Sequence, residues 1–206
     1  MIIGIIGSGG REHSICLKIH KSKKTKKIYC FPGNAGTEEI AENVNIDLEN
    51  FENIRKFILD KKIDLIIIGP EKPLVDGIVD YLEKFNINIF GPNKIAAQLE
   101  GSKIFTKQLC QKFNIPTAKF GIFKNKYEAK KYLKNSNYPI VIKADNLASG
   151  KGVYICNNNR EADNAVDEIF NGKFGKAKHL LIEEFLEGEE MSFFIISDGK
   201  NYKQFG

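Results

Sequence analysis

Short segments that are apolar almost throughout recur in the first half of the chain and limit the folds that it can adopt. Residues 1–7 read MIIGIIG, and similar runs follow at 27–31, at 64–68 after the first residue, and at 87–90. Strands that are apolar throughout belong to parallel sheets covered on both faces, because a half-exposed strand would alternate with polar residues. Stretches with helical spacing separate these runs, at about 11–21, 51–61 and 75–85. The pattern therefore predicts an α/β domain with a parallel sheet.

The pattern changes after Pro92. A long helical region is predicted at 95–113, followed by strands at 119–123, 139–143, 153–156, 179–183 and 191–197. Further helices are predicted at 126–133 and 160–170. This mixture predicts a second domain of the α+β class, so we divide the chain into residues 1–101 and 102–206.

Charge and cysteine usage disfavour several classes of protein. The 206 residues carry a net charge of +5, and much of the excess lies in a lysine cluster at 18–27. Lysines are favoured near a helix C-terminus, and this cluster lacks the aromatic residues or arginines of a nucleic-acid arm, so no nucleic-acid partner is expected. The four cysteines form no CxxC pair, and no segment approaches the length of about 18 apolar residues needed for a membrane span. We expect a cytoplasmic protein with no membrane partner.

A glycine-rich loop, GSGGREH at 7–13, follows the first predicted strand. It is not a dinucleotide fingerprint, because Glu12 stands where GxGxxG has its last glycine and the second strand ends without an acidic residue for a ribose. An NAD-dependent oxidoreductase is therefore disfavoured. Gly9 and Gly10 would let backbone N–H groups approach an anion at a helix N-terminus, and Arg11 adds a bidentate phosphate donor. The same loop is also compatible with a tight turn that holds no ligand.

Two further loops follow the neighbouring parallel strands, PGNAGT at 32–37 and GPEKPLVDG at 69–77. Ligands bind at the carboxyl ends of the strands in such sheets, so both loops are expected beside the glycine-rich loop. Glu71 is placed to accept hydrogen bonds from sugar hydroxyls. Each segment alone is equally compatible with an ordinary loop.

The second half carries a different ordered set of residues. Lys103 and Lys143 could neutralise phosphate oxygens, and Asp145 shares a strand face with Lys143. Residues 148–152, ASGKG, are small enough to fold over phosphates as a lid, although the P-loop pattern GxxxxGK[ST] is absent. Residues 183–186, EEFL, would read an adenine edge through backbone groups, and Glu189 or Glu190 would accept from a ribose. Each of these could alone be a surface residue, but the ordered set predicts an ATP site.

Taken together, these segments resemble one family. GSGGREH, PGNAGT, GPEKPLVDG, AAQLEGSKIFTK, PIVIKAD, SGKGV and IEEFLEGEEMSF occur in register from residue 3 to about residue 199. The chain resembles the phosphoribosylamine–glycine ligases (glycinamide ribonucleotide synthetases), purine-biosynthesis enzymes of the ATP-grasp superfamily. The resemblance implies a Rossmann-like pre-ATP-grasp domain followed by a partial ATP-grasp domain, which is its first lobe and the start of the second. Other ATP-grasp enzymes, such as biotin carboxylase, share the lysines and the hinge, here residues 183–186, but should lack GREH, PGNAGT and GPExPL.

The resemblance also implies a reaction, in which ATP, glycine and 5-phosphoribosylamine give glycinamide ribonucleotide, ADP and phosphate through a glycyl phosphate. The residues matched to the phosphoribosylamine site are Gly9, Gly10, Arg11, Glu12, Asn34, Gly36 and Glu71. Those matched to the ATP site are Lys103, Lys143, Asp145, Ser149, Gly150, Lys151, Gly152, Glu183, Glu184, Phe185, Leu186 and Glu190. No catalytic residue is assigned.

The chain departs from the family pattern in two ways. Asn146 and Ser149 stand where the family favours glycine and alanine, and both changes are mild because Asn tolerates the left-handed conformation and Ser is small. The family also continues for about as much again, with the second lobe and its magnesium ligands, so the Mg²⁺ ligands are expected downstream of residue 206. A monomer is expected. The alternative hypothesis is a truncated, non-catalytic module that binds a nucleotide or a phosphosugar.

Overall fold

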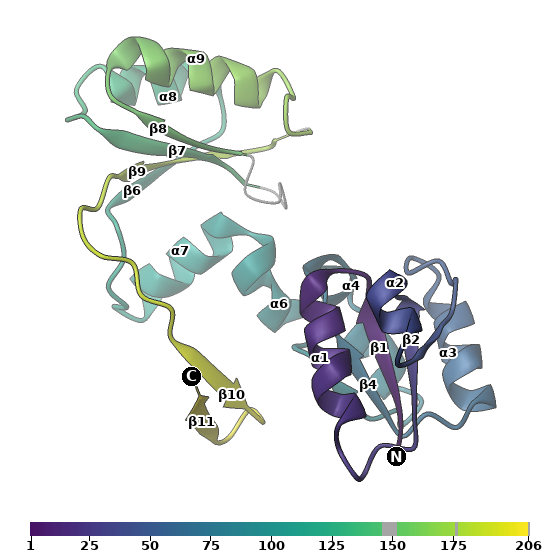
Figure 1. The fold of residues 1–206 in the computed structure, drawn as a ribbon. Coiled ribbons are helices and arrows are strands. Elements are labelled where there is room, and N and C mark those ends of the chain that lie inside the picture. Colours follow the sequence, from purple (N-terminus) through teal and green to yellow (C-terminus); the bar gives the residue numbers. More distant parts are fainter. Residues whose placement is uncertain (146–151, 176, 206) are drawn as a thin grey trace.

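The computed structural model describes residues 1–145, 152–175 and 177–205 of the chain. Three sheets are present in this part: a five-stranded sheet of order β3-β2-β1-β4-β5, a four-stranded sheet of order β6-β9-β7-β8, and the two-stranded hairpin β10-β11. The two larger sheets lie in separate bodies that are joined by two helices, α6 (Lys94–Gly101) and α7 (Lys103–Lys112) (Figure 1). The chain is therefore α/β in its first part and α+β with antiparallel sheets in its second, as the sequence predicts.

The first sheet is parallel throughout. Its strands are β1 (Ile2–Gly7), β2 (Lys27–Pro32), β3 (Glu42–Asn43), β4 (Leu65–Ile68) and β5 (Ile89–Phe90). Helix α1 (Gly10–His20) packs with Ile3 and Ile5 on one face, whereas α3 (Phe51–Asp60) and α5 (Ile78–Glu83) pack with Ile6 on the other. Both faces of β1 are therefore buried, which explains why its sequence shows no polar alternation.

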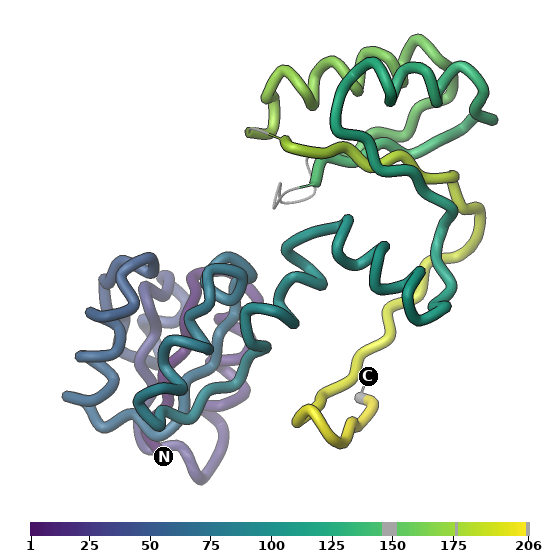
Figure 2. The backbone as a smooth tube through the Cα atoms, turned by 180° about the vertical axis from the view of Figure 1, so that it is seen from behind, coloured from purple at the N-terminus to yellow at the C-terminus, as the bar shows by residue number. Residues whose placement is uncertain are grey.

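The second sheet is antiparallel and has helices of its own on one face. Its strands are β6 (Phe120–Phe123), β7 (Ile140–Ala144), β8 (Val153–Cys156) and β9 (Leu180–Glu184). Alternate residues of β7, Ile140, Ile142 and Ala144, enter a core with α8 (Lys126–Leu133) and α9 (Asn159–Phe170). Lys143 belongs to the opposite face of the strand, on the side where α7 runs (Figures 1 and 2).

Two predicted helices are each broken into two. The region 95–113 divides at Ser102, which leaves the helical conformation (φ −139°, ψ 115°) and caps α7 by accepting a hydrogen bond from the Phe105 N–H. The predicted helix 75–85 is wrong in the same way, because Gly77 adopts a left-handed conformation (φ 98°) between α4 (Glu71–Asp76) and α5. Helix α4 thus occupies part of the segment predicted as a loop. A single capping residue ends a helix locally without disturbing the apolar spacing on either side, which is why spacing alone missed both breaks.

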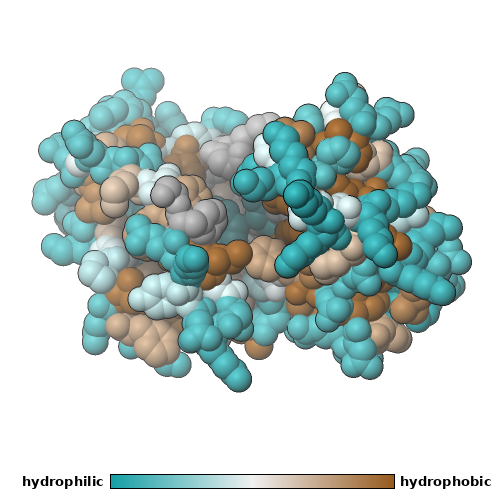
Figure 3. Space-filling model, turned by 60° about the horizontal axis from the view of Figure 1, so that its bottom comes forward, coloured by the Kyte–Doolittle hydropathy of each residue, from teal (hydrophilic) through white to brown (hydrophobic). Residues whose placement is uncertain are grey.

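Three short elements were not predicted at all: α2 (Ala35–Glu38), β3, and β11 (Tyr202–Phe205). Strand β11 pairs antiparallel with β10 (Phe194–Ser197) in a hairpin that lies apart from both larger sheets in Figure 1. The hairpin leaves large hydrophobic side chains exposed, including Phe194 at 55% and Tyr202 at 75%. Figure 3 presents one face of the molecule, on which hydrophobic residues lie among the hydrophilic ones.

None of the helices in the described ranges is both long and apolar enough to span a bilayer.

Candidate functional site

The side chain of Glu12 holds the glycine-rich loop in place through a hydrogen bond and close packing. The loop leaves β1 at Gly7 and enters α1 at Gly10, and the Glu12 carboxylate accepts a hydrogen bond of 2.6 Å from the Gly9 N–H. Glu12 is 5% exposed, and a Cβ added to Gly7 or Gly69 would lie within 2.4 Å of its Cγ. The two glycines are therefore required by the space that this side chain fills. Glu12, which was matched to the phosphoribosylamine site, thus supports the loop, and its carboxylate already accepts the hydrogen bond of the Gly9 N–H.

Gly10, Arg11 and Glu71 lie at the same edge of the parallel sheet and are accessible from solvent. A Cβ at Gly10 would meet nothing within 4 Å, so the start of α1 is sterically accessible. The Arg11 Nη2 lies 2.8 Å from the Glu71 Oε1, with side-chain exposures of 77% and 40%. A hydrogen bond from its own backbone N–H, together with this pairing, lowers the pKa of Glu71. The predicted phosphate donor and the predicted sugar acceptor thus lie together at the carboxyl ends of β1 and β4, each holding the other.

Asn34 ties the second loop to the first. Its Oδ1 accepts from the backbone N–H groups of Gly36 (2.9 Å) and Thr37 (3.0 Å), which starts α2. Its Nδ2 donates to the Ser8 carbonyl at 2.9 Å, across to the glycine-rich loop. The structure therefore brings the seven residues predicted for the phosphoribosylamine site to one edge of the parallel sheet. Asn34, like Glu12, holds the loops through its hydrogen bonds.

Gly36 lies directly against a side chain that the sequence interpretation did not include. A Cβ at Gly36 would come within 2.2 Å of the His13 Cε1 and 2.5 Å of its Nδ1. His13 is the last residue of the GSGGREH motif and projects from the first turns of α1. The imidazole therefore packs on the backbone of α2, and Gly36 is the residue that allows this approach.

We expect Gly36→Ala to destabilise the chain by about 1 kcal/mol, because the added methyl group overpacks the contact with His13. In the background of His13→Ala the same substitution should cost much less, since the obstructing ring is gone. Urea unfolding of the two single variants and the double variant measures the coupling. An equal cost of Gly36→Ala with and without the imidazole would contradict this packing.

The second cluster joins two strands and a helix around one carboxylate. Glu183, on β9, is 5% exposed. Its Oε2 lies 2.7 Å from the Nζ of Lys143, on β7, and its Oε1 lies 3.3 Å from the Nζ of Lys107, on α7. Lys143 and Glu183 were both predicted for the ATP site, but Lys107 was missed. One lysine among many in a helix gives no sequence signal of burial.

Asp145 holds the N-terminus of α7 against the end of β7. Its carboxylate accepts from the Ser102 Oγ at 3.1 Å and from the Ile104 N–H at 3.1 Å. These two bonds place Lys103, the first residue of α7, beside the strand that carries Lys143. As the alternation predicts, Asp145 and Lys143 both face α7. A carboxylate at a helix N-terminus is stabilised there, so Asp145 has a structural partner of its own.

The other described residues that were predicted for the ATP site lie at or beyond the ends of β7, β8 and β9. Glu184 ends β9 and accepts from the Lys119 N–H at 2.8 Å, whereas Leu186, beyond it, is 64% exposed. The Gly152 carbonyl accepts from the Ala144 N–H at 2.9 Å, which closes the β7–β8 connection. Phe185 and Glu190 follow β9 outside regular structure, and Glu190 is exposed. Ser149, Gly150 and Lys151, the core of the predicted lid, lie outside the described residues.

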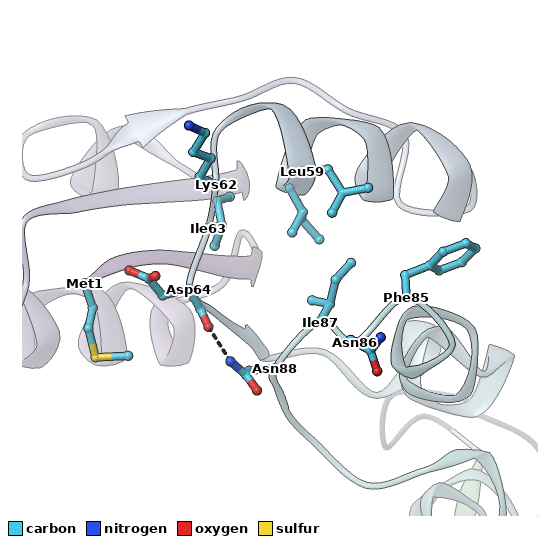
Figure 4. Close-up of a pocket in the computed structure, with 10 residues that line it drawn as sticks. Met1, Leu59, Lys62, Ile63, Asp64, Phe85, Asn86, Ile87 and Asn88 are labelled. Carbon is cyan, nitrogen blue, oxygen red and sulfur yellow. Dashed lines mark hydrogen bonds between the residues drawn. The ribbon is translucent and has the colours of Figure 1, made fainter.

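A separate cavity of about 570 Å³ lies at the opposite edge of the first sheet (Figure 4). Met1, Asp64 and Asn88 border it just before β1, β4 and β5, and the Asn88 Nδ2 donates to the Asp64 carbonyl at 3.0 Å. The cavity contains none of the predicted site residues. Because ligands of parallel sheets bind at the carboxyl ends, we place the candidate site at the loops and not in this cavity.

Within residues 1–145, 152–175 and 177–205, no group of three or more His, Cys, Asp or Glu side chains is arranged to hold a metal ion.

Comparison with protein families matches both parts of the chain. Residues 1–100 match the model described as "Phosphoribosylglycinamide synthetase, N domain", and residues 101–206 match "Phosphoribosylglycinamide synthetase, ATP-grasp (A) domain". A phosphoribosylamine–glycine ligase of Brucella melitensis is 48% identical over 201 residues, which are 97% of this chain and 47% of that protein. The chain spans about half the length of the curated relatives it matches.

Solved structures show the same similarity. The crystal structure of phosphoribosylamine–glycine ligase from Thermotoga maritima matches with a TM-score of 0.82 and 32% identity, over 99% of this chain and 49% of that one. The biotin carboxylase domain of the Hydrogenobacter thermophilus 2-oxoglutarate carboxylase, solved with MgADP, matches with a TM-score of 0.69 and 23% identity, over 90% of this chain and 44% of that one. The second likeness is one of fold alone.

Proposed function

Because the chain belongs to the phosphoribosylglycinamide synthetase family, we propose that it serves the ATP-dependent ligation of glycine to 5-phosphoribosylamine, a step of purine biosynthesis. The products would be glycinamide ribonucleotide, ADP and phosphate, with glycyl phosphate as the intermediate. The observation that carries this proposal is the presence of two separate cationic sites in one chain, Arg11 at the parallel sheet and Lys143 at the antiparallel sheet. A ligase with two phosphorylated substrates needs two such sites.

At the first site, Arg11 would exchange its bond with Glu71 for one with the substrate phosphate. An arginine fork binds phosphate oxygens in pairs, and the accessible N-terminus of α1 at Gly10 adds backbone donors and a favourable dipole. Glu71, released from Arg11, would accept hydrogen bonds from the ribose hydroxyls. The scaffold formed by Glu12 and Asn34 would keep these groups in place before binding, which lowers the entropy that binding costs.

At the second site, Lys103 and Lys143 would neutralise the triphosphate of ATP, and the hinge from Glu183 to Leu186 would hold the adenine. Neutralising the phosphate oxygens favours attack by the glycine carboxylate, because charge develops on the transferred phosphoryl group and its leaving group. Mg²⁺ is the ion that would share this task. The described residues provide no cluster for it, and we assign no step to it here. We propose residues 1–101 as the phosphoribosylamine-binding domain and 102–206 as the nucleotide-binding part, in a cytoplasmic monomer.

The second candidate function is a binding module that holds the phosphorylated ligands without turnover. Phosphoryl transfer without a metal loses much of its charge stabilisation, so such a module would hold ATP and leave its phosphates intact. An assay of ADP release separates the two candidates. A ligase should release ADP only when both glycine and phosphoribosylamine are present, whereas a binding module should bind ATP and release none.

We expect Arg11→Ala to weaken binding of ribose 5-phosphate, a stable probe of the phosphosugar, by roughly tenfold or more, because a charge-assisted bond to phosphate is lost. Binding of ATP should stay unchanged, since Arg11 lies on α1, beside the other sheet. Isothermal titration calorimetry with both ligands measures this. Arg160→Ala, an exposed arginine on α9, is the matched control. Equal losses for the two ligands would refute the assignment of two separate sites.

A further inference from the structure

The ammonium group of Lys107 is buried and surrounded by protein oxygen atoms. Its side chain is 11% exposed and reaches from α7 towards β9. The Nζ lies 2.6 Å from the Thr117 Oγ1, 3.3 Å from the Ala118 carbonyl and 3.3 Å from the Glu183 Oε1. Two hydrogen bonds and an ion pair thus surround this buried ammonium group with oxygen atoms of the protein. Lys107 is therefore unsuited to bind a ligand itself.

Lys143, which shares the same carboxylate, is placed differently. Its side chain is 27% exposed, against 6% for Glu183, and its Nζ bonds to the Glu183 Oε2 at 2.7 Å. The carboxylate therefore has one ammonium group on each oxygen, of which one is enclosed and the other reaches solvent. Two ammonium groups and one carboxylate leave a net positive charge, and Lys143 is the member that can present it.

We infer that Lys107 is a positioning residue for the proposed nucleotide site, which neutralises and anchors Glu183 so that the charge of Lys143 remains available to a phosphate. This inference rests on the proposed function of that site. Without Lys107, Glu183 and Lys143 would form an isolated pair with no net charge. A phosphate would then have to compete with a buried carboxylate for the same ammonium group, and such competition is costly where the surroundings exclude water.

Lys107 could instead act only as a clamp between α7 and the second sheet. The two roles differ in which ligands they affect. Loss of a clamp disturbs the whole site, so it weakens ATP and adenosine alike. Loss of the charge balance acts on the phosphates, so it weakens ATP and leaves adenosine unaffected. The ratio of the two affinities therefore reports on the role of Lys107.

Calorimetric titration of the 206-residue chain with ATP and with adenosine tests the inference in three variants: Lys107→Met, Lys107→Met/Glu183→Gln and Lys143→Ala. In Lys107→Met, the Kd for ATP should rise roughly tenfold, within the range for members of one salt-bridge network, and the Kd for adenosine should not change. The double variant removes the uncompensated carboxylate as well and should regain most of the ATP affinity. Unchanged ATP binding in Lys107→Met, equal losses for both ligands, or no recovery in the double variant would overturn the inference.

Lys143→Ala separates this inference from the proposed function. If that variant binds ATP as the parent chain does, the nucleotide site itself is wrong, and the charge balance is then tested without a nucleotide. An amine-reactive reagent should label Lys143 several-fold more slowly in Lys107→Met than in the parent chain, because Glu183 then holds that ammonium alone, and the double variant should restore the rate. Equal rates in all three proteins would overturn the inference. Far-UV circular dichroism of each variant verifies that it is folded.

Discussion

Lys143→Ala is expected to raise the Kd for ATP by roughly tenfold to a hundredfold. The Lys143 ammonium is the partly exposed cation of the second sheet that is bonded to a buried carboxylate, and its hydrogen bond to a phosphate would be assisted by charge. Removing such a bond costs about 1.5 to 3 kcal/mol of binding free energy, which gives the stated change in Kd. The fold should persist, because Glu183 keeps its second ion pair, with Lys107.

The matched control for this prediction is Lys131→Ala, which removes an exposed lysine from α8 on the other face of the same sheet. Its net charge equals that of Lys143→Ala, so any effect of overall charge on ATP binding appears in both. Calorimetry at two salt concentrations adds a second check, because a direct phosphate contact should become weaker as the salt concentration rises. Equal ATP affinities in the two variants would mean that the nucleotide binds elsewhere.

Glu12→Ala is expected to destabilise the chain by about 2 to 4 kcal/mol. The substitution leaves the Gly9 N–H without its acceptor and opens a cavity between Gly7 and Gly69, and each of these effects costs free energy. The free energy of unfolding in urea, followed by circular dichroism, measures the loss. Binding of ribose 5-phosphate should weaken as well, since the loop that presents Arg11 loses its support.

Two other substitutions show whether this loss comes from the capping bond. Glu12→Gln keeps the volume and an acceptor oxygen, so it should lose much less stability than Glu12→Ala. Glu39→Ala removes an exposed carboxylate from the end of α2 and should change the stability by less than about 0.5 kcal/mol. If Glu12→Ala proved as mild as Glu39→Ala, the loop would not depend on Glu12 for its shape.

The parallel sheet could be predicted because its physical cause is visible in the sequence. Strand β1 is buried on both faces, so each of its residues is apolar or glycine, and the same holds nearly throughout β2 and β4. The edge strand β5 lies within the predicted run at 87–90, whereas the edge strand β3 has only two residues, Glu42 and Asn43, both polar, and was missed. The position of β3 comes from its pairing with β2, and that is a tertiary property.

The candidate site was predictable where a residue type has a local reason to be present. Glycines at a strand-to-helix turn and lysines beside a glycine-rich segment are such cases. The sequence could not predict which residues of the site support the loops and which remain available to a ligand. Asn34 and Glu12 were predicted for the phosphoribosylamine site, and the structure adds that their hydrogen bonds hold the loops, with partners that are found only after the strands are side by side. Lys107 meets Glu183, far along the sequence, for the same reason.

Because their strand orders differ, the first sheet can assemble strand by strand during protein synthesis, whereas the second must wait for its last strand. In the first sheet, the earliest strand, β1, lies in the middle, so β2 and β4 can add to it as they leave the ribosome. In the second, β9 is the last strand made and lies between β6 and β7, so this sheet cannot close before residue 184 is available. Contacts over long sequence separations form slowly. During that interval β6 and β7 expose edges that β9 will later cover, and a nascent chain is most open to mispairing there.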